Sequence, residues 1–231
     1  MKNYHLLATL LFSVQALSLN IQAAALEPAA GSAWTEPKTG MEFIWVPSGC
    51  FQMGGNGEAF EKPIHKVCLK GFWVGRYEVT QKQYQQIMGE NPSKFQGANN
   101  PVDFVNWHDA SNFTNKMSSA ANTKIRLLSE AEWEYACRAG GTHDTYCGNG
   151  AVDKLGWYSG NSEKTTHPVG KLTANAWGLY DMSGNVFEWT EDCQNNSYKG
   201  APADGSAWNA RNCVMRAGRG GAWNNNPDVL S

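Results

Sequence analysis

The side chains with the widest range of possible chemistry in this chain are its six cysteines, at positions 50, 68, 137, 147, 193 and 213. A thiolate can bind a soft metal or act as a nucleophile, and two thiols can close a disulfide. No two cysteines have the C-x-x-C spacing of a structural metal site, and no histidine stands beside any pair. An even number of cysteines, all beyond the export signal described below, favours disulfides. The sequence therefore predicts three disulfides rather than a thiolate site.

The pairing of these cysteines follows from their positions along the chain. Residues 51–54 and 66–69 read as the two strands of a hairpin, so Cys50 and Cys68, which flank it, are expected to pair. The next nearest pairs are Cys137 with Cys147 and Cys193 with Cys213, and each would close a local loop. Other connectivities stay open from sequence alone.

The histidines do not form a recognisable site. Four of them are scattered along the chain without the spacing of metal ligands, namely His65, His108, His143 and His167. We interpret each as a surface or capping residue rather than as a catalyst.

Two further patterns could suggest chemistry but lack the required context. Glu130, Glu132 and Glu134 alternate along a predicted helix, where residues two apart point to different faces, so they do not make a paired-carboxylate site. The run Gly54–Gly57 lacks the strand, lysine and helix that surround a phosphate-binding loop. We interpret it as a plain loop.

The N-terminus has the layout of a secretory signal peptide, predicted over residues 1–25. Lys2 is followed by an apolar run from Leu6 to Val14 and by small residues up to Ala25. The alternative is a membrane anchor, but the apolar core is about half of the roughly 20 residues that a spanning helix needs. We therefore expect a periplasmic or secreted protein that does not insert into the membrane after cleavage. The net charge of -2 gives no reason to expect a nucleic acid or an anionic membrane as partner.

The remaining chain is long enough for one large domain with a core of its own. Residues 26–40 are rich in Pro, Ala, Gly and Ser and read as a linker, and residues 41–231 form the predicted domain. Ten Trp and 24 Gly suggest many loops that are held by buried indoles.

Three helices are predicted from N-terminal capping patterns, in which a Ser, Thr or Asn is followed three residues later by Glu, Gln or Asp. The predicted helices run to about Met88 after the cap Thr80, from Trp107 to about Ser118 after Asn106, and onward from Ser129. The third helix places Trp133, Ala136, Cys137 and Gly140 on one face, which we expect in the core. Short strands are expected at residues 43–47, 72–77, 124–128 and 213–216.

The order of several motifs resembles the formylglycine-generating enzyme family, also called the sulfatase-modifying factor family. The matching blocks are Met41–Gly54, Tyr77–Thr80, Pro101–Trp107, Arg126–Ala136, Gly178–Trp189 and Arg219–Gly221. Together they cover about residues 41–227 in the order of the family. The resemblance implies an α+β fold related to C-type lectins, with low regular secondary structure, a small twisted sheet and about three helices.

The family's activity converts a cysteine of a sulfatase to formylglycine with molecular oxygen and a copper ion held by two cysteines. The resemblance therefore implies a sulfatase as a possible partner. Counted at the family's spacing, the two cysteine positions are occupied by Asn225 and Leu230, and the active-site serine position by Ala222. Neither Asn nor Leu offers the soft thiolate that Cu(I) prefers. We therefore expect no catalytic residues and no copper in this chain.

The same resemblance implies a calcium site in the block Gly178–Trp189. Its ligands would be the carboxylates of Asp181 and Glu188 and the backbone carbonyls of Gly184 and Val186. Calcium takes several oxygen ligands and accepts carbonyls from a glycine-bent loop. The alternative is a plain turn in which Asp181 caps its own backbone and Glu188 pairs with an arginine.

Two functions follow from these observations. One is a formylglycine-generating oxidase, against which the absent cysteine pair counts. The other is a non-catalytic binding or accessory module on the same scaffold, which we favour. The segment Trp223–Pro227 resembles the start of the asparagine-rich variable segment in proteins that are diversified by retroelements on this scaffold.

The end of the sequence adds one expectation about the fold. Family members close with a Gly-Phe-Arg strand after the Arg-Gly-Gly block, whereas this sequence ends at Ser231. We expect the domain to lack that last strand, which would leave a neighbouring strand unpaired.

Overall fold

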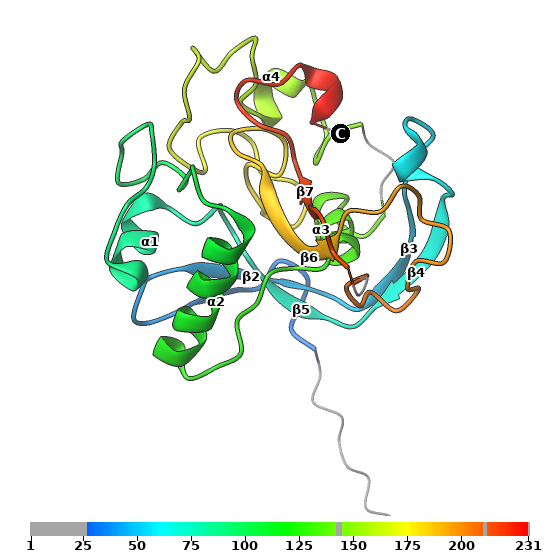
Figure 1. Cartoon of the computed structure of the whole chain (residues 1–231), viewed down its shortest axis with the longest axis horizontal. Coiled ribbons are helices and arrows are strands. Elements are labelled where there is room, and N and C mark those ends of the chain that lie inside the picture. Colours follow the sequence, from blue (N-terminus) through cyan, green and yellow to red (C-terminus); the bar gives the residue numbers. More distant parts are fainter. Residues whose placement is uncertain (1–26, 142–144, 210–211, 231) are drawn as a thin grey trace, which may run out of the picture.

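The structure, a computed structural model, describes residues 27–141, 145–209 and 212–230. The helices are α1 Gln81–Met88, α2 Trp107–Ala121, α3 Glu130–Cys137 and α4 Val152–Leu155. The strands are β1 Ala33–Thr35, β2 Glu42–Val46, β3 Gly49–Met53, β4 His65–Leu69, β5 Phe72–Gly75, β6 Glu188–Cys193 and β7 Arg216–Arg219. Two 3₁₀ turns cover Ala59–Glu61 and Pro227–Val229. Figure 1 shows α1 and α2 on one side, the β3–β4 hairpin on the other, and β6 and β7 between them.

Three small antiparallel sheets carry the fold. In the first, β2 lies between β1 and β5, and Ile44 pairs with Ala33 on one side and with Val74 on the other. The second is the predicted hairpin of β3 and β4, in which Cys50 lies opposite Cys68. The third pairs β6 with β7. The mixed architecture with little regular structure confirms the predicted fold class.

The long helices begin at the predicted caps. Each of Thr80, Asn106 and Ser129 accepts a hydrogen bond from the backbone N–H three residues on, and the side chain of that residue bonds back to the backbone of the cap. Such capping boxes satisfy N–H groups that the first turn of a helix leaves without partners. The helix α3 is buried on all sides rather than on one face, because it packs between the hairpin and the β6–β7 sheet.

Several local predictions were wrong. Residues 124–128 form no strand, and the strand expected at 213–216 lies at Arg216–Arg219. Within the region predicted as a linker, Ala33–Thr35 forms an edge strand that pairs with β2. Pairing with a neighbouring strand, and not local composition, decides whether such a segment becomes a strand. The short helix α4 and the strand β6 were not predicted. Gly140 lies beyond the end of α3 with a φ of 92° instead of extending its face.

The core has two parts. The larger cluster surrounds α3, where Trp133 is 1% exposed and packs with residues of β2, β3, β4 and β5. The smaller cluster lies between β2 and the pair α1 and α2, and it consists of Met41, Phe43, Tyr84, Phe113 and Met117. The two clusters bury opposite faces of β2, since Ile44 belongs to the first and Phe43 to the second.

A buried ion network joins α3 to β7 and to the loop after β3. Arg219 donates to Glu134 at 2.8 Å and lies 3.5 Å from Glu130, and Arg138 contacts the other oxygen of Glu134 at 3.0 Å. That oxygen also accepts the backbone N–H of Gly54 at 2.9 Å. Glu130 and Glu134 therefore both bind Arg219 and hold α3 to β7.

All three predicted disulfides are present, since Cys50 is bonded to Cys68, Cys137 to Cys147 and Cys193 to Cys213. Disulfides of this kind are typical of proteins outside the reducing cytosol. None of the helices in the described residues has the length and apolarity that a bilayer crossing requires. The predicted signal peptide lies outside the residues that the structure describes.

The disulfides predict the thiol content of the purified protein. Because all six cysteines are paired, thiol titration of the oxidised protein in denaturant should detect no free thiol. Loss of a single bridge should lower the free energy of unfolding by about 2–5 kcal/mol. Two or more titratable thiols per chain would show that one of the three bridges does not form.

The ion network predicts unequal effects of two arginine substitutions. Arg219→Met should lower the free energy of unfolding by about 3 kcal/mol, because it leaves two buried carboxylates short of a partner. The matched change Arg76→Met breaks a half-exposed pair with Glu42 and should cost less than about 1 kcal/mol. Urea unfolding of both variants makes the comparison, and equal losses would argue against the network.

Candidate functional site

The turn from Asp181 to Glu188 brings together buried acids whose charges act on one another. Asp181 and Asn185 adopt left-handed backbone conformations with φ of 57° and 61°, and Gly184 has a φ of 93°. A Cβ at Gly184 would lie 2.2 Å from the carbonyl oxygen of Trp157, so the turn requires glycine there. The close approach is held by a hydrogen bond from the Asn185 N–H to the same Trp157 carbonyl at 2.8 Å.

The first predicted ligand, Asp181, is 3% exposed, and only one of its two carboxylate oxygens has a hydrogen-bond partner among the described residues. One carboxylate oxygen accepts the backbone N–H of Gly170 at 2.7 Å, and Oδ1 is buried without a hydrogen-bond partner among the described residues. Burial raises the pKa of Asp181 to about 6. An unpaired carboxylate oxygen in the interior is costly unless a cation or water meets it.

The second predicted side-chain ligand, Glu188, stands at the start of β6 and accepts the indole N–H of Trp133 at 3.1 Å. Burial raises its pKa to about 7, and the charge of Asp181 adds to the shift. Neither acid forms a salt bridge with a described residue, so the expected alternative of an arginine partner for Glu188 is not found.

A third buried acid, Glu78, was not identified from the sequence as part of this site. Its carboxylate accepts the side-chain amide of Asn185 at 2.7 Å and the backbone N–H of Val186 at 3.0 Å. Burial raises the pKa of Glu78 well above its usual range, and the charges of Asp181 and Glu188 raise it further. The only signal in the sequence was the position of Glu78 inside the block Tyr77–Thr80.

These residues fit a hard cation, because buried carboxylate oxygens lack compensating positive charge. Within the described residues, no three side chains of His, Cys, Asp or Glu converge closely enough to hold a metal by themselves. A cation here would therefore bind Asp181 and Glu188 together with backbone carbonyls, of which Gly184 and Val186 are the predicted ones. The backbone N–H of Gly184 is already bonded to the carbonyl of Gly220 at 2.7 Å, which ties the turn to the Arg-Gly-Gly block.

The three positions at which the family's spacing predicts the active site take part in loop closure and in the core. Ala222 and Asn225 close a loop on each other: the Ala222 N–H donates to Asn225 Oδ1 at 2.8 Å, and the Asn225 N–H donates to the Ala222 carbonyl at 2.9 Å. Leu230 is completely buried, and its carbonyl accepts the hydroxyl of Ser183 at 3.1 Å. The positions predicted for the two copper ligands therefore hold a loop-closing amide and a core side chain.

Each described histidine packs beside a different aromatic ring. His65 lies beside Tyr198, His108 lies beside Trp107, and the ring of His167 stacks on Trp157 at 3.8 Å. His143 lies outside the described residues. The run Gly54–Gly57 is a loop, as predicted, and the backbone N–H groups of Gly54 and Gly57 donate to the carboxylates of Glu134 and Glu61.

Comparison with known proteins places this geometry in a family. The sulfatase-modifying factor enzyme 1-like domain matches residues 29–231. The chaperone protein LppX of Paenibacillus barcinonensis is 35% identical over an alignment that covers 53% of this chain and 62% of LppX. The serine/threonine-protein kinase pkn1 of Chlamydia caviae is 30% identical over 82% of this chain and 34% of the kinase. The formylglycine-generating enzyme of Mycobacterium tuberculosis is 26% identical over 64% of this chain and 73% of the enzyme. The chain thus spans less than two thirds of LppX and about a third of pkn1.

Solved structures share the fold at similar identity. PvdO from Pseudomonas aeruginosa superimposes with a TM-score of 0.78 at 31% identity, over 87% of this chain and 89% of PvdO. Treponema denticola variable protein 1 superimposes with a TM-score of 0.77 at 29% identity, over 86% of this chain and 90% of that protein. The chain therefore belongs to the sulfatase-modifying factor enzyme 1-like domain family.

Proposed function

We propose that this chain is an exported, non-catalytic binding or accessory module of its family, with its central turn held by a calcium ion. The observation that carries the proposal is the absence of a thiol for copper. All six cysteines of the chain are in disulfides, and the family's copper positions hold Asn225 and Leu230. The remaining donors at those positions are amide and carbonyl oxygens, which suit hard cations and not Cu(I).

The relatives support a role other than oxidation. Proteins of this family bear names as different as chaperone, kinase and formylglycine-generating enzyme, so the shared domain does not imply one activity. An accessory role agrees with the relative that is named as a chaperone. Export agrees with the three disulfides and with the predicted signal peptide at residues 1–25.

The alternative is a formylglycine-generating oxidase that acts on a sulfatase, which the relative from M. tuberculosis favours. Such an enzyme would need two thiolates within reach of one copper ion. Cys193 and Cys213 are the cysteines nearest to the Arg-Gly-Gly block in sequence, but they are bonded to each other. A disulfide offers no thiolate, so this alternative lacks its metal site.

The calcium proposal rests on the buried acids around the turn. Calcium would neutralise the charges of Asp181 and Glu188 and bind Oδ1 of Asp181, which has no hydrogen-bond partner among the described residues. It would also fix the loop that carries Gly184 and Val186. Its role would be structural, since none of the expected ligands lies at a position that reacts in the family. A fixed turn would in turn fix the Arg-Gly-Gly block, to which it is bonded.

Calcium should stabilise the protein, because a ligand that binds only the folded state shifts the equilibrium toward it. At about 100 times its Kd the gain should be about 3 kcal/mol, measured as a rise in the thermal midpoint. Asp181→Asn and Glu188→Gln should lose most of this gain, and the exposed control Glu163→Gln should keep it.

The same variants distinguish a cation site from a plain structural role. In a chelator, Glu188→Gln should be no less stable than the wild type, because the amide still accepts from Trp133 while a buried charge is removed. If Glu188→Gln is destabilised equally with and without calcium, the residue is structural and the site is elsewhere.

The protein should not convert a sulfatase-type cysteine peptide to formylglycine, even with copper and oxygen supplied. Mass spectrometry of the incubated peptide gives the readout, and a formylglycine-generating enzyme acting on the same peptide gives the positive control. Copper-dependent appearance of the aldehyde, with the mass loss that accompanies it, would overturn the non-catalytic proposal.

A further inference from the structure

One of the three disulfides lies on the surface of the molecule. Cys50 and Cys68 are both exposed and lie directly opposite each other in the β3–β4 hairpin. Phe51 and Val67, their neighbours along the two strands, point to the other face and are buried in the core. The bridge therefore lies on the side of the hairpin that solvent reaches.

The other two bridges are shielded. Cys137 is 7% and Cys147 is 4% exposed, so both ends of their bridge are buried. Cys213 is half-buried, but its partner Cys193 is only 3% exposed. A thiol that attacked Cys213 would have to expel the buried sulfur of Cys193 as a thiolate, and burial disfavours that charge. Exchange with an external thiol should therefore begin at the exposed bridge.

Cationic side chains stand at one end of the exposed bridge. Lys66 and Lys70 lie two residues before and two residues after Cys68, and all three residues are exposed, so they share the outer face of the hairpin. Neither lysine forms a salt bridge with another described residue. Cations beside a sulfur stabilise its thiolate, which is the form that leaves when a disulfide is opened.

The acids near the bridge keep its two ends unequal. Glu27 lies at the opposite end, where its carboxylate accepts the N–H and the hydroxyl of Ser48 at 3.2 and 3.1 Å. Its charge opposes a thiolate at that end. Hydrogen bonds from Ser206 lower the pKa of Asp204, and the nearby charge of Lys70 lowers it further. Asp204 thus offsets only one of the two lysines in part.

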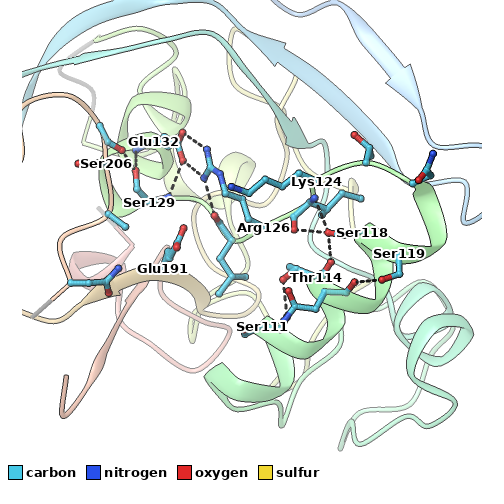
Figure 2. Close-up of a pocket in the computed structure, with 18 residues that line it drawn as sticks. Ser111, Thr114, Ser118, Ser119, Lys124, Arg126, Ser129, Glu132, Glu191 and Ser206 are labelled. Atoms are coloured by element: carbon cyan, nitrogen blue, oxygen red, sulfur yellow. Dashed lines mark hydrogen bonds and ion pairs between the residues drawn. The ribbon is translucent and has the colours of Figure 1, made fainter. Parts of the chain in front are cut away.

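The hairpin is attached to the rest of the fold without the bridge. The Cys68 N–H donates to the carbonyl of Ala203 at 2.9 Å. In the same loop, the Gly205 carbonyl accepts the hydroxyl of Ser129, the cap of α3, at 2.7 Å. This loop lines a groove of about 950 Å³ beside α2, in which Figure 2 shows Ser129 and Ser206. Opening the bridge would therefore leave β4 held by this loop.

We propose that Cys50–Cys68 is a site of thiol–disulfide exchange whose substrate is an anionic thiol. The thiolate of the substrate attacks Sγ of Cys50, and the bond between the two cysteine sulfurs breaks. Cys68 leaves as a thiolate beside Lys66 and Lys70. The product is a mixed disulfide between Cys50 and the substrate.

A second substrate thiol completes the exchange. Its thiolate attacks the substrate sulfur of the mixed disulfide and releases Cys50. Two substrate thiols are thereby oxidised to a disulfide, and the bridge is reduced by two electrons to two thiols, which take up the two protons that the substrate loses. This inference goes beyond the proposed function and does not depend on it, because none of the expected calcium ligands or copper positions takes part.

The site of the first attack can be determined with the wild-type protein. The oxidised full chain is incubated briefly with mercaptoethanesulfonate, an anionic thiol, quenched with acid and mapped by mass spectrometry of its peptides. We expect the adduct on Cys50, and we expect this bridge to open about tenfold or more faster than the other two. An adduct mainly on Cys68, or equally fast opening of another bridge, would overturn the proposal.

The preference for an anionic thiol is tested by changing the charges. Rates of opening are compared for mercaptoethanesulfonate and for cysteamine, a cationic thiol, each divided by the fraction of the thiol that is ionised. The anionic thiol should react faster, and the ratio of the two rates should fall about tenfold in the double variant Lys66→Glu with Lys70→Glu. The exposed control Lys82→Glu, on α1, should keep the wild-type ratio.

Salt gives a second measurement that requires no variant. At about 1 M salt the Debye length falls to about 3 Å, so the wild-type ratio should approach that of the double variant. A ratio that neither the double variant nor salt changes would overturn the assignment of an anionic substrate. The thermal midpoint of each oxidised variant controls for unfolding. All of these readouts are on the chain's own cysteines, so they do not depend on the outcome of the oxidase or calcium experiments.

Discussion

The structure depends on three acids that are buried around one turn without a positive partner. Glu78, Asp181 and Glu188 come from the segment after β5, the turn itself and the start of β6, so the turn joins segments that are distant in sequence. Burial raises the pKa of each one, and the neighbouring acids raise the pKa of Glu78 and Glu188 further, so the ionised forms oppose folding unless something compensates them. A cation bound by these carboxylates would offset the free-energy cost of their burial and would link the three segments to one another.

Backbone hydrogen bonds connect the turn to the region in which the family's active site is expected. Gly184 donates to the carbonyl of Gly220, and Trp223 donates to the carbonyl of Asn185, so the turn sets the path of the Arg-Gly-Gly block. Arg219 at the start of that block enters the ion network of α3. Asn225 and Leu230, which stand where the family's spacing predicts the copper ligands, lie in the region that this support holds.

Sequence alone predicted the features that are set by short-range rules. The capping boxes placed the starts of α1, α2 and α3, and the nearest-neighbour pairing of the cysteines gave all three disulfides. Features set by distant contacts were missed, because nothing near them in sequence marks them. Glu78 joins the site through hydrogen bonds to residues more than a hundred positions away. The segment 124–128 had the pattern of a strand but found no neighbour to pair with, which a pattern cannot reveal.

The metal content of the purified protein tests the central claim most directly. Elemental analysis after dialysis against trace calcium and copper, together with native mass spectrometry, would give the stoichiometry of each ion. A structural cation site in a chain without copper ligands predicts about one calcium per chain and no copper, with the calcium lost in Asp181→Asn. Stoichiometric copper in the wild type, with calcium absent, would contradict the account.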